Sequence, residues 1–112
     1  MSNDSLEIEK YLQQGDVLII RVGEVPTEAK AVQHDGILAK GEATGHNHKV
    51  AVSDMPNTLF YEKGGQLFIK NSNIIKIEHQ EHKTIELPVG EWEIKKVKEY
   101  DHFLEESRSV RD

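Results

Sequence analysis

Four of the six histidines occur in two short motifs, His46-Asn47-His48 and, about thirty residues later, His79-Gln80-Glu81-His82. Imidazole is the commonest metal ligand in proteins and the side chain most easily tuned for proton transfer near neutral pH. Residues two apart on a strand project from one face, about 6.5–7 Å apart along the chain, so His46 and His48 can converge on one ion. His79 and His82 would leave a regular strand on opposite faces. They can share a site only if the chain turns between them.

This spacing predicts a divalent-metal site. The predicted ligands are the four histidines of the two motifs, with two glutamates as candidate carboxylate ligands or as partners that orient the rings: His46, His48, His79, His82, Glu42 and Glu81. The chain has no cysteine, so thiolate ligands and a cysteine nucleophile are excluded. Imidazole suits zinc, iron and nickel alike, and the pattern does not choose among them. Four protein ligands would form a closed structural site, whereas three ligands and a water would leave a position open for chemistry.

Two other interpretations use the same residues without a metal. In the first, His46, His48 or His82 act as general acid and base while Lys49 or Lys83 stabilises a developing negative charge, which suits phosphodiester cleavage in RNA or a nucleotide. In the second, the domain is a non-catalytic binding or regulatory module whose histidines contact a partner or respond to pH. Each histidine taken alone is more simply an edge-of-core residue bonded to backbone. Whether the protein is an enzyme stays open.

The elements that must position these residues are strands. Alternating apolar residues and regularly spaced turns predict an all-β single domain, a small barrel or two-sheet sandwich of about seven or eight strands. The predicted strands are 16–22, 36–40, 46–52, 58–61, 66–70, 74–79, 84–87 and 91–100. Within 46–52 the even-numbered residues His46, His48, Val50 and Val52 share a face, and His79 shares the parity of Ile75 and Ile77. Three histidines therefore fall on core-facing positions.

The rest of the chain is read as connections and termini. Residues 1–14 are predicted to be an arm or a short helix over Leu6 to Gln14, and 101–112 a charged tail or docking helix. Glu28 to Asp35 reads as a loop, and Lys63-Gly64-Gly65 as the turn of a hairpin. The change of parity at Val97 predicts a bulge near Lys95-Lys96. His34 and His102 are expected at the surface.

Composition sets the remaining bounds. The chain has 112 residues and a formal net charge of −6, which fits one domain and disfavours coating duplex DNA or an anionic membrane. It has no signal-peptide pattern and no stretch long enough to span a membrane, so a cytoplasmic location is expected. The expected partner is a small molecule or nucleotide, and an exposed edge strand makes a homodimer plausible.

The order of histidines resembles that of cupins, small β-barrels in which His-x-His on one strand meets a further histidine on a later strand. The resemblance implies a barrel with a metal bound by His46, His48 and a later histidine. The chain departs from the cupin pattern at three places. Four residues instead of five separate Gly41 from His46, Val52 and Ser53 stand where a glutamate is required, and the later Pro88 and Gly90 follow the last histidine instead of preceding it.

The whole chain resembles a set of small uncharacterised bacterial and phage proteins. The segments that carry this likeness are Gln14-Gly15-Asp16-Val17-Leu18, Gly41-Glu42-Ala43-Thr44-Gly45-His46-Asn47-His48, Leu87-Pro88-Val89-Gly90 with the preceding His82 and Ile85, and Glu99-Tyr100-Asp101. The resemblance implies a family with this histidine arrangement and supplies no activity or substrate.

Overall fold

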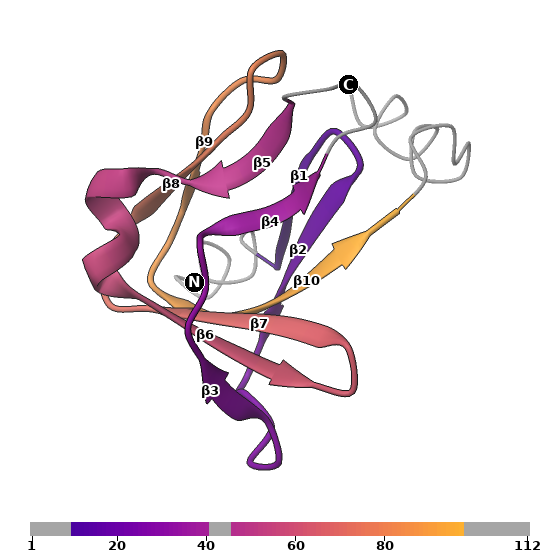
Figure 1. The fold of residues 1–112 in the computed structure, drawn as a ribbon, viewed down its shortest axis with the longest axis vertical. Helices are drawn as coiled ribbons and strands as arrows, with labels where there is room; N and C mark the ends of the chain where they lie inside the picture. Colours follow the sequence, from indigo (N-terminus) through magenta and orange to yellow (C-terminus); the bar gives the residue numbers. More distant parts are fainter. Residues whose placement is uncertain (1–9, 41–45, 98–112) are drawn as a thin grey trace, which may run out of the picture.

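The computed structural model describes residues 10–40 and 46–97, in which two antiparallel sheets pack against each other (Figure 1). The first sheet has six strands in the order β1-β2-β10-β7-β6-β3, and the second has four in the order β4-β5-β8-β9. In chain order the strands are β1 (Tyr11–Gln14), β2 (Val17–Val22), β3 (Lys30–Val32), β4 (Ile37–Lys40), β5 (Asn47–Val50), β6 (Thr58–Lys63), β7 (Gln66–Asn71), β8 (Ile75–Glu78), β9 (Ile85–Leu87) and β10 (Gly90–Lys96). The predicted all-β architecture is confirmed in its two-sheet form.

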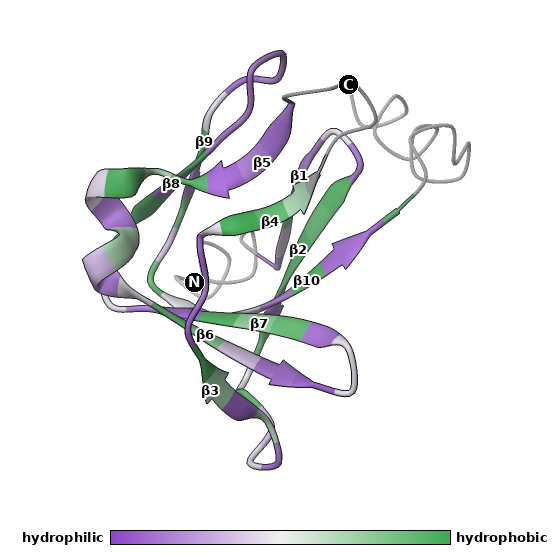
Figure 2. Ribbon diagram, viewed as in Figure 1, coloured by the Kyte–Doolittle hydropathy of each residue, from purple (hydrophilic) through white to green (hydrophobic). Residues whose placement is uncertain are grey.

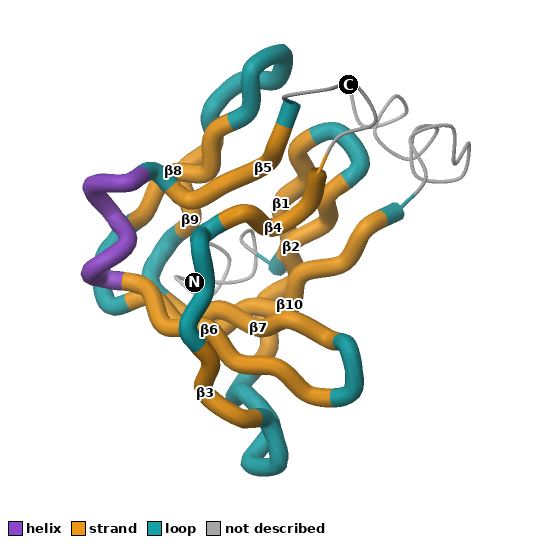
Figure 3. The backbone as a smooth tube through the Cα atoms, in the orientation of Figure 1, coloured by secondary structure: helices purple, strands orange, loops and turns teal. Residues whose placement is uncertain are grey.

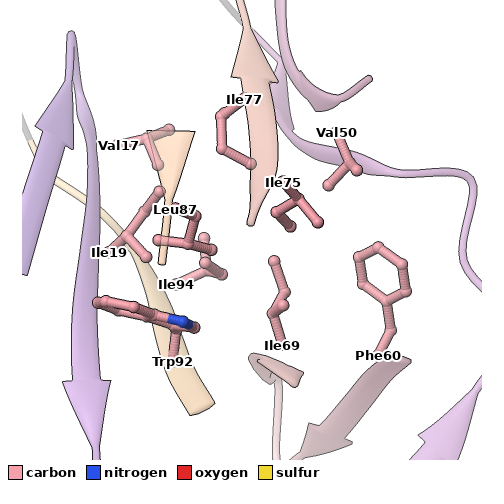
Figure 4. Close-up of a cluster of buried hydrophobic side chains, with 10 residues drawn as sticks. All are labelled: Val17, Ile19, Val50, Phe60, Ile69, Ile75, Ile77, Leu87, Trp92 and Ile94. Atoms are coloured by element: carbon pink, nitrogen blue, oxygen red, sulfur yellow. The ribbon is translucent and has the colours of Figure 1, made fainter. Parts of the chain in front are cut away.

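The core lies between the two sheets and contains the branched residues expected from the sequence (Figure 4). Val17 and Ile19 of β2 are fully buried and face Ile75 and Ile77 of β8 across the interior. Trp92 of β10 is also fully buried at the lower end of this cluster. Burial of each such side chain is worth about 1.5–3 kcal/mol, so the core supplies the main force that holds the sheets together.

The hairpin of β6 and β7 forms where the sequence predicted it. The strands pair from Thr58↔Asn71 to Lys63↔Gln66, and the turn is Gly64-Gly65. Both glycines have positive φ, 54° and 84°, which side chains with a Cβ rarely adopt. Two residues with positive φ make the tight turn whose twist matches a hairpin.

Four expectations for the elements are corrected. Tyr11–Gln14 pairs with β2 as a strand and is not part of a helix, and Lys30–Val32 pairs with β6 instead of lying in a loop. Two short strands were therefore missed, because each depends on a distant partner more than on its own pattern. No bulge occurs near Lys95, since β10 stays in register with β2 through Lys96↔Val17. The register shift lies instead between Ile37 and Ala39.

The fourth correction concerns Val52, which is 76% exposed instead of facing the core. β5 ends at Val50, and residues Val52–Asn57 form the 3₁₀ helix η1, drawn in purple in Figure 3. Asp54 accepts a hydrogen bond from the Lys76 amide at 2.8 Å and fixes η1 beside β8. Among residues 10–40 and 46–97, no helix is long and apolar enough to cross a membrane. Residues 1–9 of the predicted N-terminal arm or helix, and the predicted tail 101–112, lie outside the described residues.

Candidate functional site

Three parts of the chain meet at one end of the sandwich: the β1–β2 turn, the start of β5, and the segment between β8 and β9 (Figure 1). These parts are hydrophilic, whereas β2 and β7 are largely hydrophobic (Figure 2). The two histidine motifs lie here. The ring centroids are 4.3 Å apart for His48 and His79, 4.5 Å for His79 and His82, and 5.8 Å for both His48–His82 and His46–His79. The structure therefore brings together all four predicted histidines.

His48 is the buried centre of this group and is 1% exposed. It faces the interior because β5 alternates, and the next residue on the same face, Val50, is also buried. Its Nδ1 lies 2.8 Å from Gln14 Oε1, and its Nε2 lies 3.0 Å from Asp16 Oδ1. Both ring nitrogens of His48 thus have partners, one at the end of β1 and one in the β1–β2 turn.

The amide of Gln14 determines where the proton of His48 sits. Gln14 Nε2 donates to two carbonyl oxygens, those of Ile77 and Lys83, each at 2.9 Å. Both partners are pure acceptors, so the amide nitrogen must face them and Oε1 must face the imidazole. Oε1 can only accept, and His48 Nδ1 therefore carries the hydrogen of that bond.

The other nitrogen of His48 faces a carboxylate. Burial lowers the pKa of His48 below its ordinary value of 6.5, positive charge on His79 and His82 would lower it further, and Asp16 acts in the opposite direction. In a neutral ring protonated on Nδ1, Nε2 presents a lone pair to the Asp16 oxygen. Two acceptors 3.0 Å apart in a buried place repel each other unless a proton or another cation lies between them. The space between these two atoms therefore favours a positive charge.

Gly15 allows the β8–β9 connection to come close. A Cβ at this position would lie 2.5 Å from His82 Nε2, and the residue has a φ of 58°. Any side chain here would be strained and would push the imidazole of His82 away. Glycine therefore lets the β1–β2 turn and the β8–β9 connection meet at the site.

His79 follows β8 and sits between His48 and His46. Burial lowers its pKa, and so do the charges of His82 and His46, against the opposite effect of Glu81 and Asp16. Its Nδ1 accepts the backbone N–H of Glu81 at 3.0 Å, so the neutral ring holds its proton on Nε2. In this arrangement His79 offers a donor, and ligation of an ion requires that the Glu81 bond be given up.

His46 and Glu81 form the outer rim of the cluster. His46 Nδ1 lies 3.5 Å from Glu81 Oε2, and their side chains are 26% and 66% exposed. The Glu81 carboxylate thus contacts His46, which is partly exposed, instead of the buried His48. Lys96 approaches from β10, with Nζ 3.8 Å from Asp16 Oδ2.

Comparison with known proteins gives a family and no activity. The model of a domain of unknown function, DUF8820, matches residues 13–97. The chain belongs to this DUF8820 family. No curated protein and no solved structure matches it. The matched span of the DUF8820 domain contains Gln14, Asp16 and all four histidines of the site.

Two residues of the DUF8820 site, Gln14 and Asp16, were not predicted from the histidine motifs. They lie 34 and 32 residues from His48 in the chain, so no local spacing links them to it. The signal that the sequence offered was the pair of polar residues, Gln14 and Asp16, next to the most apolar strand. In the structure their side chains are buried, with exposures of 3% and 7%. Polar residues buried to this extent are usually engaged in a specific network.

Other candidates lie away from the centre of the DUF8820 site or outside the described residues. Lys49 alternates with buried His48, so it leaves β5 on the opposite face, where it pairs in register with Glu78. Glu42 and His102 are outside the described residues. His34 is not the expected surface residue, since its side chain is 15% exposed and its ring stacks on Phe60 at 4.3 Å.

The donor atoms of the DUF8820 site are only partly arranged for a metal. Within residues 10–40 and 46–97, no group of three or more histidine, aspartate or glutamate side chains is already placed to hold an ion. The pair His48 Nε2 and Asp16 Oδ1 has the spacing of two ligands of one ion, and both of its side chains are buried. Two ligand atoms on one ion, at bond lengths of about 2.0–2.2 Å, lie about 2.8–3.6 Å apart. Their separation of 3.0 Å falls in that range.

Proposed function

We propose that the DUF8820 domain binds one divalent transition-metal ion between His48 Nε2 and Asp16 Oδ1. The observation that carries this proposal is the buried 3.0 Å contact between an imidazole nitrogen and a carboxylate oxygen, two groups that can both ligate a metal ion. Burial lowers the pKa of His48, which favours the neutral imidazole that ligates metals. Gln14 supplies the acceptor for the other ring nitrogen, as carbonyl partners commonly do for metal-ligating histidines.

The third and fourth ligands come from the β8–β9 connection and from water or substrate. His82 lies next to the pair, with its ring stacked at 5.8 Å from that of His48. Two imidazoles on one ion have ring centroids about 4.5–5.3 Å apart, so the ring of His82 would have to move closer to that of His48 to share the ion. His79 can join after it gives up the Glu81 amide. Zinc, iron and nickel all suit nitrogen and oxygen ligands, and a water-bearing position would make the site catalytic.

Metal analysis of untagged protein tests this function. Wild type is expected to hold about one ion per chain and to gain thermal stability from added zinc, nickel or iron, because a ligand at 100 times its Kd adds about 2.7 kcal/mol. His48→Gln should lose both properties. His34→Gln is the matched control, since this half-buried histidine contacts Phe60 and not the cluster. Wild type without stoichiometric metal and without metal-dependent stabilisation would refute the proposal.

A second function, metal-free acid/base cleavage of a phosphodiester in RNA or a nucleotide, has one observation in its favour. At the rim of the site the Glu81 carboxylate lies 3.5 Å from His46 Nδ1, whereas the buried Asp16 lies on the Nε2 side of His48. A carboxylate on Nδ1 orients an imidazole so that Nε2 is available to take a proton from a substrate hydroxyl. This function predicts RNA or dinucleotide cleavage in the presence of chelator that is lost in His46→Gln and kept in His34→Gln. No cleavage by wild type would exclude it.

A further inference from the structure

We propose that Gln14 is a positioning residue of the histidine site, which holds the proton of His48 on Nδ1 and fastens the segment that carries His79 and His82. The consequence for metal affinity rests on the metal-binding function proposed above. The effect on the proton of His48 holds in the metal-free protein as well, so the two proposals can fail separately.

The contacts of Gln14 span both sheets. Its side chain leaves β1 of the six-stranded sheet, is 3% exposed, and bonds to the end of β8, to the β8–β9 connection and to β5. The two carbonyl groups that accept from it, those of Ile77 and Lys83, lie on either side of the segment 78–82. The same amide therefore closes this segment at both ends and reaches His48.

Only a primary amide of this length satisfies all three contacts. Glutamate retains an acceptor for His48 Nδ1–H but has no N–H for the two carbonyls, and methionine of similar length has neither. Each substitution therefore leaves specific hydrogen bonds of the buried network unmade, and a buried group without its partner is destabilising.

Loss of the acceptor should move the proton of His48. Without Gln14 Oε1, the Nδ1–H bond has no partner, whereas Nε2 can still donate to Asp16 Oδ1 at 3.0 Å. The ring of Gln14→Met is therefore expected to carry its proton on Nε2. The Nε2 lone pair that faces Asp16 is then no longer available for an ion.

Nitrogen-15 NMR of the imidazoles in metal-free protein tests this directly. Wild type should show a protected proton on His48 Nδ1, and Gln14→Met should lose that signal and show Nδ1 as unprotonated. Gln13→Met is the matched control, because the neighbouring Gln13 donates to the Gly15 carbonyl and does not contact His48. A protonated Nδ1 retained in Gln14→Met would overturn the proposal.

Gln14→Glu tests the fastening and decides the matter if Gln14→Met does not fold. It is expected to keep the Nδ1 proton and to speed hydrogen exchange of the amides in segment 78–82, since both carbonyl contacts lose their donor. Unchanged exchange in this segment would overturn the proposal.

Zinc titration of the same proteins measures the consequence at the site. Zinc affinity is expected to fall about 10–100-fold in Gln14→Met and to stay unchanged in Gln13→Met. Equal affinity of Gln14→Met and wild type would overturn the positioning role. Absence of zinc binding by wild type would refute the metal-binding function, and the NMR result would still decide the role of Gln14.

Discussion

Each end of the sandwich contains a buried primary amide. The two amides differ in the ring whose N–H bonds to the amide oxygen. At the histidine end, Gln14 donates to two carbonyls and accepts from His48 Nδ1. At the opposite end, Asn71, 2% exposed, donates to the carbonyls of Asn73, Leu87 and Pro88 at 2.8–3.2 Å. Its Oδ1 accepts from Trp92 Nε1 at 3.1 Å. At both ends, hydrogen bonds from a buried side-chain amide thus connect the two sheets.

The difference lies in the group beyond the amide. Indole has a single N–H, so the network of Asn71 ends at Trp92 with every polar atom satisfied. Imidazole has a second nitrogen, and that of His48 faces Asp16 across a gap that requires a cation. The network at the Asn71 end therefore only stabilises the fold, whereas the network at the Gln14 end also leaves a position for a proton or a metal ion. Substitutions at the two ends should separate stability from metal binding.

The largest expected effect is on stability, at the Trp92 end. Trp92→Ala removes a fully buried indole from the core and should lower the free energy of unfolding by about 3–5 kcal/mol. Urea denaturation with chelator present measures it. Any molecules that remain folded should still gain stability from zinc, because the site lies at the other end. A loss below about 1 kcal/mol would show that Trp92 does not anchor the core.

The next effect is on metal affinity, at the Gln14 end. Asp16→Asn replaces the carboxylate by an amide whose N–H can bond to His48 Nε2 without any cation. Zinc affinity should fall at least about 100-fold, which corresponds to about 2.7 kcal/mol. Isothermal titration measures it, with Asp54→Asn as control, since Asp54 binds the Lys76 amide outside the cluster. Equal affinity in Asp16→Asn would remove Asp16 from the ligand set.

A smaller loss of stability is expected for Asn71→Leu. The substitution leaves three carbonyls without the amide donor and weakens the bonding of the Trp92 N–H, which retains Pro88 at 3.2 Å. The cost should be about 1–3 kcal/mol in urea denaturation, and zinc affinity should not change. A change in zinc affinity would contradict the separation of the two ends.

The smallest expected effect is the response of the metal-free protein to mild acid. The pKa values of His48 and His79 are lowered in the fold, so below 6.5 the unfolded chain binds more protons than the folded one. Their contribution to stability is complete above 6.5 and is lost as pH falls from 6.5 through the lowered values. Asp16, Glu81, His46 and His82 face these rings and set the size of the loss.

Urea denaturation with chelator at about pH 7.5 and about pH 5.5 measures this response. Wild type should be less stable at the lower pH, and His79→Gln should show a weaker dependence. The Asn71 end contains no titrating group in its network, so Asn71→Leu should keep the pH dependence of wild type. Higher stability at the lower pH would contradict the direction of the pKa shifts.

Much of the fold was predictable because it depends on local alternation and turns. The β6–β7 hairpin follows from Gly64-Gly65, and the burial of His48 follows from its parity with Val50. The pairing of His79 with His82 follows from the turn between them. Strands β1 and β3 were not predictable in this way, since short segments become strands through the partners that bind their backbones.

The sequence by itself determined which end of the molecule would be polar, because two histidine motifs sit where apolar strands begin and end. Only the tertiary structure decided what surrounds them. Gln14 and Asp16 reach His48 from more than thirty residues away, and the fully occupied ring of His48 is a consequence of that encounter. The physical reason is that side-chain period fixes the face from which a residue projects, whereas its hydrogen-bond partners depend on how the two sheets are packed.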